Sequence, residues 1–120
     1  MITKPVRWIS CLTLALFIAG CATAPSQKSG AALRIGVAPD YPPVIFKQDK
    51  VIAGMEADLA VNLAKTLQRP YEFVEMDWVK LIPSLLDGKI DIIMSGMTIT
   101  DERAVRIAFT KPYLKTGQMA

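Results

Sequence analysis

The sequence predicts an α/β fold in which helices cover both faces of a parallel sheet. Short apolar runs at residues 33–37, 71–74 and 90–94 are typical of strands, and stretches with helical spacing separate them. From Leu33 onward the predicted order is strand, helix, strand, helix, strand, helix. Such alternation favours parallel pairing, because parallel strands need a long crossover between them.

Each element has a local reason. Residues 33–37 are rich in branched apolar side chains, and the prolines at 39, 42 and 43 predict a loop over 38–50. A short hairpin is expected there, through 44–46 and 51–52. A helix is expected over 55–67, where the apolar positions recur at helical spacing: Met55, Leu59, Ala60, Leu63, Ala64 and Leu67.

The second half of the domain repeats the pattern. After the strand at 71–74, Asp77 can cap a helix that Asp87-Gly88 closes, although Pro83 inside it weakens this prediction. A third strand is expected over 90–94, followed by a short helix over 101–106. The carboxyl ends of parallel strands meet at one edge of a sheet, where ligands bind in such folds.

The segment from Ser95 to Arg103 is the strongest candidate site at that edge. Small and hydroxyl residues follow the strand, Thr100 can cap the next helix, and Arg103 lies one turn into it. Backbone donors near Thr98 and the Arg103 guanidinium would suit a small carboxylate, and Gly96 would allow close approach. The alternative is an ordinary capped helix whose arginine pairs with Asp101 or Glu102 on the surface.

Two aromatic residues lie on the neighbouring loops. Tyr41 precedes a stiff proline pair, and Trp78 follows Asp77 at a helix start. Either ring could form a wall of a binding site, and either could instead pack over the core.

The first 32 residues read as export signals. Lys4 and Arg7 precede an apolar run that is too short to span a bilayer and that ends in Ala19-Gly20-Cys21. This resembles a bacterial lipoprotein signal at 1–20 with Cys21 as the lipidated residue; an ordinary signal peptide is the alternative. Residues 21–32 read as a flexible tether, and 33–120 as the folded domain.

Composition excludes several classes of function. Removing residues 1–20 leaves 12 of the 14 Lys and Arg against 11 Asp and Glu, so nucleic-acid binding is not indicated. The sequence has no histidine, which excludes a Ser-His-Asp triad and a His-ligated metal, and the two cysteines, Cys11 and Cys21, leave no thiol for a disulfide. We expect no catalytic residues, no metal and no cofactor.

Together the motifs strongly resemble the amino-acid solute-binding proteins of ABC transporters, family 3. The resemblance covers the chain from Leu33 onward. It rests on these segments, in order: Gly36 with Tyr41-Pro42-Pro43, Gly54-Met55-Glu56-Ala57-Asp58-Leu59, Asp77-Trp78-Val79-Lys80-Leu81-Ile82-Pro83-Ser84-Leu85, Gly88-Lys89-Ile90-Asp91, Ser95-Gly96-Met97-Thr98-Ile99-Thr100-Asp101-Glu102-Arg103 and Ala108-Phe109-Thr110-Lys111-Pro112-Tyr113.

The resemblance implies a role for each site residue. It implies that Arg103 binds the ligand α-carboxylate with help from the backbone at Thr98, and that Ser95, Gly96 and Thr98 help to hold the carboxylate and ammonium ends. Tyr41 and Trp78 would sandwich the ligand side chain. Ala38 stands where relatives selective for basic amino acids carry an acid, which counts against a Lys- or Arg-type ligand, although Asp40 is close by.

The resemblance also implies the first lobe of a two-lobe type II periplasmic binding fold, a three-layer sandwich. We therefore expect a truncated chain that is marginally stable and binds amino acids weakly or not at all on its own. The protein is expected to be a non-enzymatic lipoprotein of the periplasm or cell envelope that serves an ABC permease. The alternatives are the ligand-binding module of a lytic transglycosylase, a periplasmic dehydratase or a sensor kinase.

Overall fold

A parallel sheet of three strands forms the centre of the fold in the computed structural model, which describes residues 30–115. Strand β1 (Leu33–Val37) lies in the middle, between β5 (Tyr71–Glu75) and β6 (Ile92–Ile93), and pairs in parallel with both. The predicted parallel α/β architecture is therefore confirmed. The predicted strand over 90–94 is shorter, because only Ile92 and Ile93 pair with β1, while Ile90 and Met94 are buried beside it.

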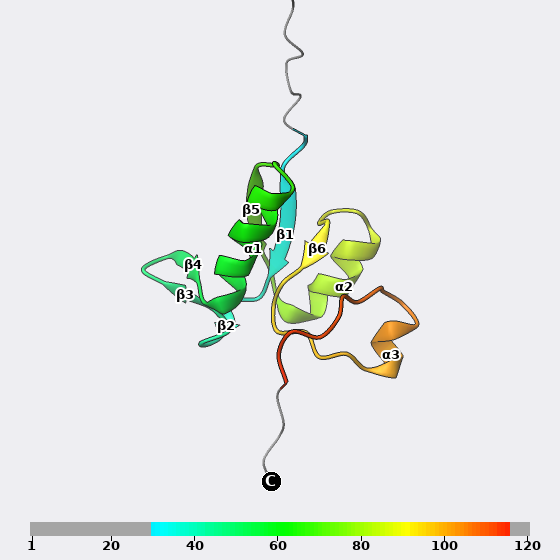
Figure 1. The fold of residues 1–120 in the computed structure, drawn as a ribbon. Helices are drawn as coiled ribbons and strands as arrows, with labels where there is room; N and C mark the ends of the chain where they lie inside the picture. Colours follow the sequence, from blue (N-terminus) through cyan, green and yellow to red (C-terminus); the bar gives the residue numbers. More distant parts are fainter. Residues whose placement is uncertain (1–29, 116–120) are drawn as a thin grey trace, which may run out of the picture.

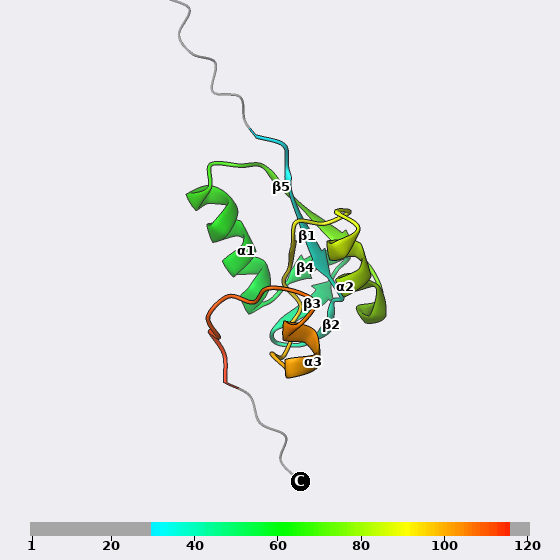
Figure 2. The same cartoon turned by 90° about the vertical axis from the view of Figure 1, so that its right-hand side faces the viewer.

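Two helices cover opposite faces of this sheet, as Figures 1 and 2 show: α1 (Met55–Thr66) on one and α2 (Trp78–Leu86) on the other. Alternate residues of β1 serve the two faces. Leu33, Ile35 and Val37 are buried with residues of α1, whereas Gly36 lies against Leu81 and Ile90 on the α2 side. A side chain at position 36 would collide with Ile90, so the glycine lets α2 and its following loop pack closely.

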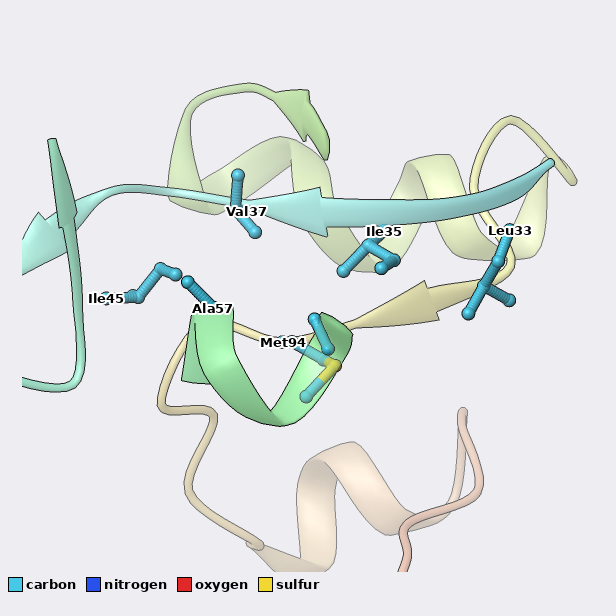
Figure 3. Close-up of a cluster of buried hydrophobic side chains, with 7 residues drawn as sticks. Leu33, Ile35, Val37, Ile45, Ala57 and Met94 are labelled. Carbon is cyan, nitrogen blue, oxygen red and sulfur yellow. The ribbon is translucent and has the colours of Figure 1, made fainter. Parts of the chain in front are cut away.

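The larger core cluster lies between β1 and α1 (Figure 3). It joins branched side chains of the strand to small residues of the helix, Ala57 and Ala60, and to Ile45 and Met94. The small residues bring the helix close to the sheet. The predicted helical face was thus partly wrong: Met55, Leu59 and Leu67 are exposed, and the buried positions are Glu56, Ala57, Ala60 and Ala64.

A small antiparallel sheet lies beside the start of α1. Its strands are β2 (Asp40–Tyr41), β3 (Ile45–Gln48) and β4 (Val51–Ala53), in that order. The predicted hairpin is confirmed, with one unforeseen strand, β2. Asp49 and Lys50 form its tight turn with positive φ angles of 48° and 68°.

Two helix ends differ from the prediction. Asp77 occupies the N-cap position of α2 but makes no capping hydrogen bond, because its carboxylate pairs with Lys80 at 2.5 Å. Thr100 does cap α3 (Asp101–Ala104), accepting from the Arg103 N–H at 3.3 Å. That helix ends two residues early, and none of its residues is buried, so no packing energy extends it.

Within residues 30–115, none of the helices is long and apolar enough to cross a membrane. The proposed signal peptide, Cys21 and most of the tether lie outside the described residues.

Candidate ligand-binding site

A cleft of about 950 Å³ opens at the carboxyl edge of the parallel sheet. Its walls are the turn at 96–99 after β6, the segment 112–115 after α3, and the side chains of Tyr41 and Glu56. The predicted site residues Tyr41, Gly96 and Thr98 therefore come together in one cleft. Ser95, Trp78 and Arg103 lie around it rather than in its lining.

Ser95 lies beneath the cleft and is only 3% exposed. Its hydroxyl accepts a hydrogen bond from the Ala38 N–H at 2.8 Å and donates one to the Ala38 carbonyl oxygen at 3.1 Å. The hydroxyl proton is therefore used within the chain, where it joins the end of β1 to the end of β6. Direct contact between Ser95 and a ligand stays a prediction.

Gly96 is the position where the backbone turns into the cleft. Its φ of +65° is a conformation that side-chain-bearing residues rarely adopt, and an added Cβ would lie 2.8 Å from Cδ1 of Tyr41. The Tyr41 ring thus rests on the glycine. At 45% exposure the ring is not a core residue, which favours its predicted place at the wall of a site.

Arg103 and Trp78 approach each other at the outer side of the turn. The Arg103 Nη1 donates to the Thr98 carbonyl oxygen at 2.9 Å, and its guanidinium carbon lies 5.6 Å from the centroid of the Trp78 ring. Stacking on an aromatic face favours a guanidinium and limits its movement. Neither Asp101 nor Glu102 forms an ion pair with Arg103 in the described part of the chain, so the alternative of a surface ion pair is not what holds the guanidinium.

Glu56 is the residue of this site to which the sequence assigned no role. Its side chain is buried, with 1% of the residue exposed. Both carboxylate oxygens accept a hydrogen bond from the Gly96 N–H, and they lie 2.9 and 2.8 Å from its nitrogen. The Tyr113 hydroxyl also donates to Oε1. Burial, and then the hydrogen bond and negative charge of Glu56, raise the pKa of Tyr113 well above its ordinary value, so the phenol remains a donor.

A second hollow of about 540 Å³ lies at the ends of β1 and β5. Its lining includes Trp78, three acids and one lysine: Asp40, Glu75, Asp77 and Lys47. Glu75 pairs with Lys47 and Asp77 with Lys80, while Asp40 forms no ion pair with any described residue. On this side of Trp78, Asp40 is therefore the acid that no described lysine or arginine neutralises.

Hydrogen-bond donors, aromatic rings and a cleft at the carboxyl edge of a parallel sheet define a small-molecule-binding lobe. The sequence profile of the bacterial extracellular solute-binding proteins, family 3, matches residues 33–120. The chain belongs to that family, as the motifs indicated.

Individual relatives agree with this assignment. The chain is 38% identical over 105 residues to a probable histidine-binding protein of Campylobacter jejuni, covering 82% of this chain and 41% of that protein. It spans about two fifths of that relative's length.

Solved structures show the same fold. The arginine-bound form of domain 1 from TmArgBP superposes with a TM-score of 0.67 at 44% identity, covering 69% of this chain and 67% of that one. The ancestral amino-acid-binding protein AncCDT-1, described as a precursor of cyclohexadienyl dehydratase, gives 0.66 at 46% identity, over 70% of this chain and 38% of that one. The fold is thus that of a first lobe of a periplasmic binding protein.

Proposed function

We propose that this chain binds an amino acid through its α-carboxylate for uptake by an ABC transporter. The observation that carries the proposal is the turn at 96–98 beside Arg103. No residue of the described part accepts a hydrogen bond from the N–H groups of Met97 or Thr98, and both residues line the cleft. A carboxylate there would meet backbone donors and, after a small shift, the guanidinium that now binds the Thr98 carbonyl.

We further propose a cationic amino acid as the ligand. Asp40 lines the second hollow beside Trp78 and forms no ion pair with a described residue, so it would favour a positive side chain. Asp40 would thus take the place of the acid that relatives selective for basic amino acids carry at the position of Ala38. Relatives named for histidine and arginine support the same class.

The decisive experiment is calorimetric titration of the 120-residue chain with arginine, histidine, lysine, glutamine and glutamate. We expect arginine, lysine or histidine to bind and glutamate not to bind. The arginine-bound form of domain 1 from TmArgBP supports a measurable affinity for residues 33–120. Absence of binding to every amino acid, or equal binding of glutamate, would refute the proposal.

Arg103→Ala tests the carboxylate role directly. A charge-assisted hydrogen bond contributes about 1.5–3 kcal/mol, so affinity should fall about 10- to 150-fold. Arg103→Lys is the matched control: it keeps the charge but loses the paired donors and should recover only part of the affinity. Unchanged affinity in Arg103→Ala would sink this role.

Delivery to a permease from a lipid anchor at Cys21 completes the proposal. The periplasm or cell envelope is the expected location, as for the extracellular family to which the chain belongs. Membrane fractionation checks the anchor: the chain should move to the soluble fraction on Cys21→Ser, and an unchanged distribution would contradict lipidation.

A further inference from the structure

Glu56 is a buried carboxylate at the wall of the cleft. It is 1% exposed, and no lysine or arginine of residues 30–115 forms an ion pair with it. Burying an ionised carboxylate is costly unless hydrogen bonds compensate it. Its compensation comes from two donors, the Gly96 N–H and the Tyr113 hydroxyl. Both donors belong to residues that line the cleft.

The backbone that carries the Glu56 side chain is held in place. The Glu56 N–H donates to the Val44 carbonyl oxygen at 2.9 Å, and an added Cβ on Gly54 would lie only 2.6 Å from that same oxygen. The first turn of α1 is therefore held tightly against the loop before β3. The Glu56 side chain therefore starts from a fixed backbone position, from which it can hold other segments in place.

Glu56 joins two segments that are far apart in the chain. Gly96 lies 40 residues away and begins the turn whose next two residues, Met97 and Thr98, have N–H groups without a described acceptor. Tyr113 lies 57 residues away, on the segment 112–115 that also lines the cleft. Because the Gly96 N–H is committed to Glu56, it is not available to a ligand, and its bond fixes the peptide that precedes the two available donors.

We propose that Glu56 is a positioning residue that holds the 96–98 turn in the shape that binds the ligand carboxylate and couples that turn to the segment 112–115. This inference rests on the proposed function for its ligand. Glu56 itself touches no ligand in this scheme. The pKa of Tyr113 is raised first by burial and then by the hydrogen bond to Glu56, which agrees with this contact.

Two variants test the coupling, each removing one part of the arrangement. Glu56→Gln keeps the side-chain volume but removes the charge and one acceptor. Tyr113→Phe deletes only a hydroxyl and should fold even if Glu56→Gln does not. Asp58→Asn is the matched control, since Asp58 is an exposed acid on the same helix.

The ligand readout compares arginine with agmatine, which is arginine without its carboxylate, by NMR titration of the full chain. Glu56→Gln should weaken arginine about tenfold and leave agmatine unchanged, because only the carboxylate uses the turn. Tyr113→Phe should act in the same direction with a smaller change, and the double variant should be no weaker than Glu56→Gln alone. Equal losses for both ligands, or no loss, would overturn the inference.

A ligand-free readout separates this inference from the proposed function. The Gly96 amide proton should be protected from exchange in the wild-type chain, lose that protection in Glu56→Gln, and lose part of it in Tyr113→Phe. Asp58→Asn should change nothing. If the chain bound no amino acid, the proposed function would fail, while these amide data would still decide whether Glu56 holds the turn. An unprotected Gly96 amide in the wild type would refute the positioning role.

Discussion

The two edges of the parallel sheet use polar groups in opposite ways. At the amino edge, polar groups satisfy one another: Asp91 accepts from the backbone N–H and the guanidinium of Arg34, and Arg69 donates to the Ala31 carbonyl. At the carboxyl edge, buried groups hold the backbone in place, and the donors beyond them face a cleft. At the amino edge an ion pair within the chain satisfies the polar groups, whereas at the carboxyl edge hydrogen-bond donors remain available to a ligand.

This difference between the two edges indicates which residues of the carboxyl edge affect stability and which affect only ligand binding. Glu56 and Ser95 are buried and Gly96 is half-buried, and these three residues support the carboxyl edge. Above them, Thr98 is exposed and Arg103 is half-buried. Changes in the support should lower stability and binding together. Changes at Thr98 or Arg103, which lie above this support, should lower binding alone.

Ser95→Ala should give the largest loss of stability. Deleting the hydroxyl leaves the buried Ala38 N–H without its acceptor, which costs about 1–3 kcal/mol. Urea unfolding would measure the change in the free energy of unfolding. Thr98→Ala is the control: it deletes an exposed hydroxyl and should change stability by less than about 0.5 kcal/mol. Equal effects of the two variants would break the distinction between support and exposed residues.

Gly96→Ala should lower stability less than Ser95→Ala. Comparison with a second glycine, Gly88, separates backbone strain from side-chain collision in this loss. Gly96 and Gly88 both have positive φ, at 65° and 69°, so alanine at either site carries backbone strain of about 1 kcal/mol. Only at 96 would the new Cβ meet a neighbour, the Tyr41 ring at 2.8 Å. We expect Gly96→Ala to exceed Gly88→Ala by about 1 kcal/mol in urea unfolding and, unlike it, to weaken ligand binding. Identical losses would mean that the Tyr41 contact is not tight.

Asp91→Asn should have the smallest effect at neutral pH, because the Arg34–Asp91 pair is partly exposed, at 36% and 31% of the two side chains. Hydrogen bonds from the Arg34 side chain and backbone lower the pKa of Asp91 from 3.8 to about 2. As pH falls, the unfolded chain takes up this proton first. The stability from the pair is therefore present above about pH 4 and lost as pH falls toward 2.

Urea unfolding at several acidic pH values would measure this dependence. Asp91→Asn should flatten it between pH 4 and 2, and Arg34→Met should do the same by removing the partner. A slope unchanged in both variants would contradict the described role of the pair.

Local sequence patterns predicted most of the fold but only part of the candidate site. Branched apolar runs, prolines and helical spacing predicted the strands, the loop and the helices, because those preferences act between near neighbours. The carboxyl edge followed from the strand order. The buried face of α1 did not, because small residues such as Ala57 and Ala60 approach the sheet more closely than Leu59 can.

Glu56 was missed for a related reason. An acid in the first turn of a helix is ordinarily a solvated partner of the helix N-terminus. Its burial depends on Gly96 and Tyr113, which no local pattern connects to it. Two signals were available. Glu56 lies in one of the segments on which the resemblance to the family rests, and it precedes an alanine on the helical face that packs on the sheet.

The central place of β1 has a consequence for the order in which the chain assembles. The bonds Arg34–Asp91, Ala38–Ser95 and Glu56–Tyr113 each span 57 residues. The first strand to leave the ribosome must therefore wait for both of its sheet neighbours, and such distant pairing slows folding. The wall at 112–115 arrives last, so the cleft is complete only after its support and its turn have already been made.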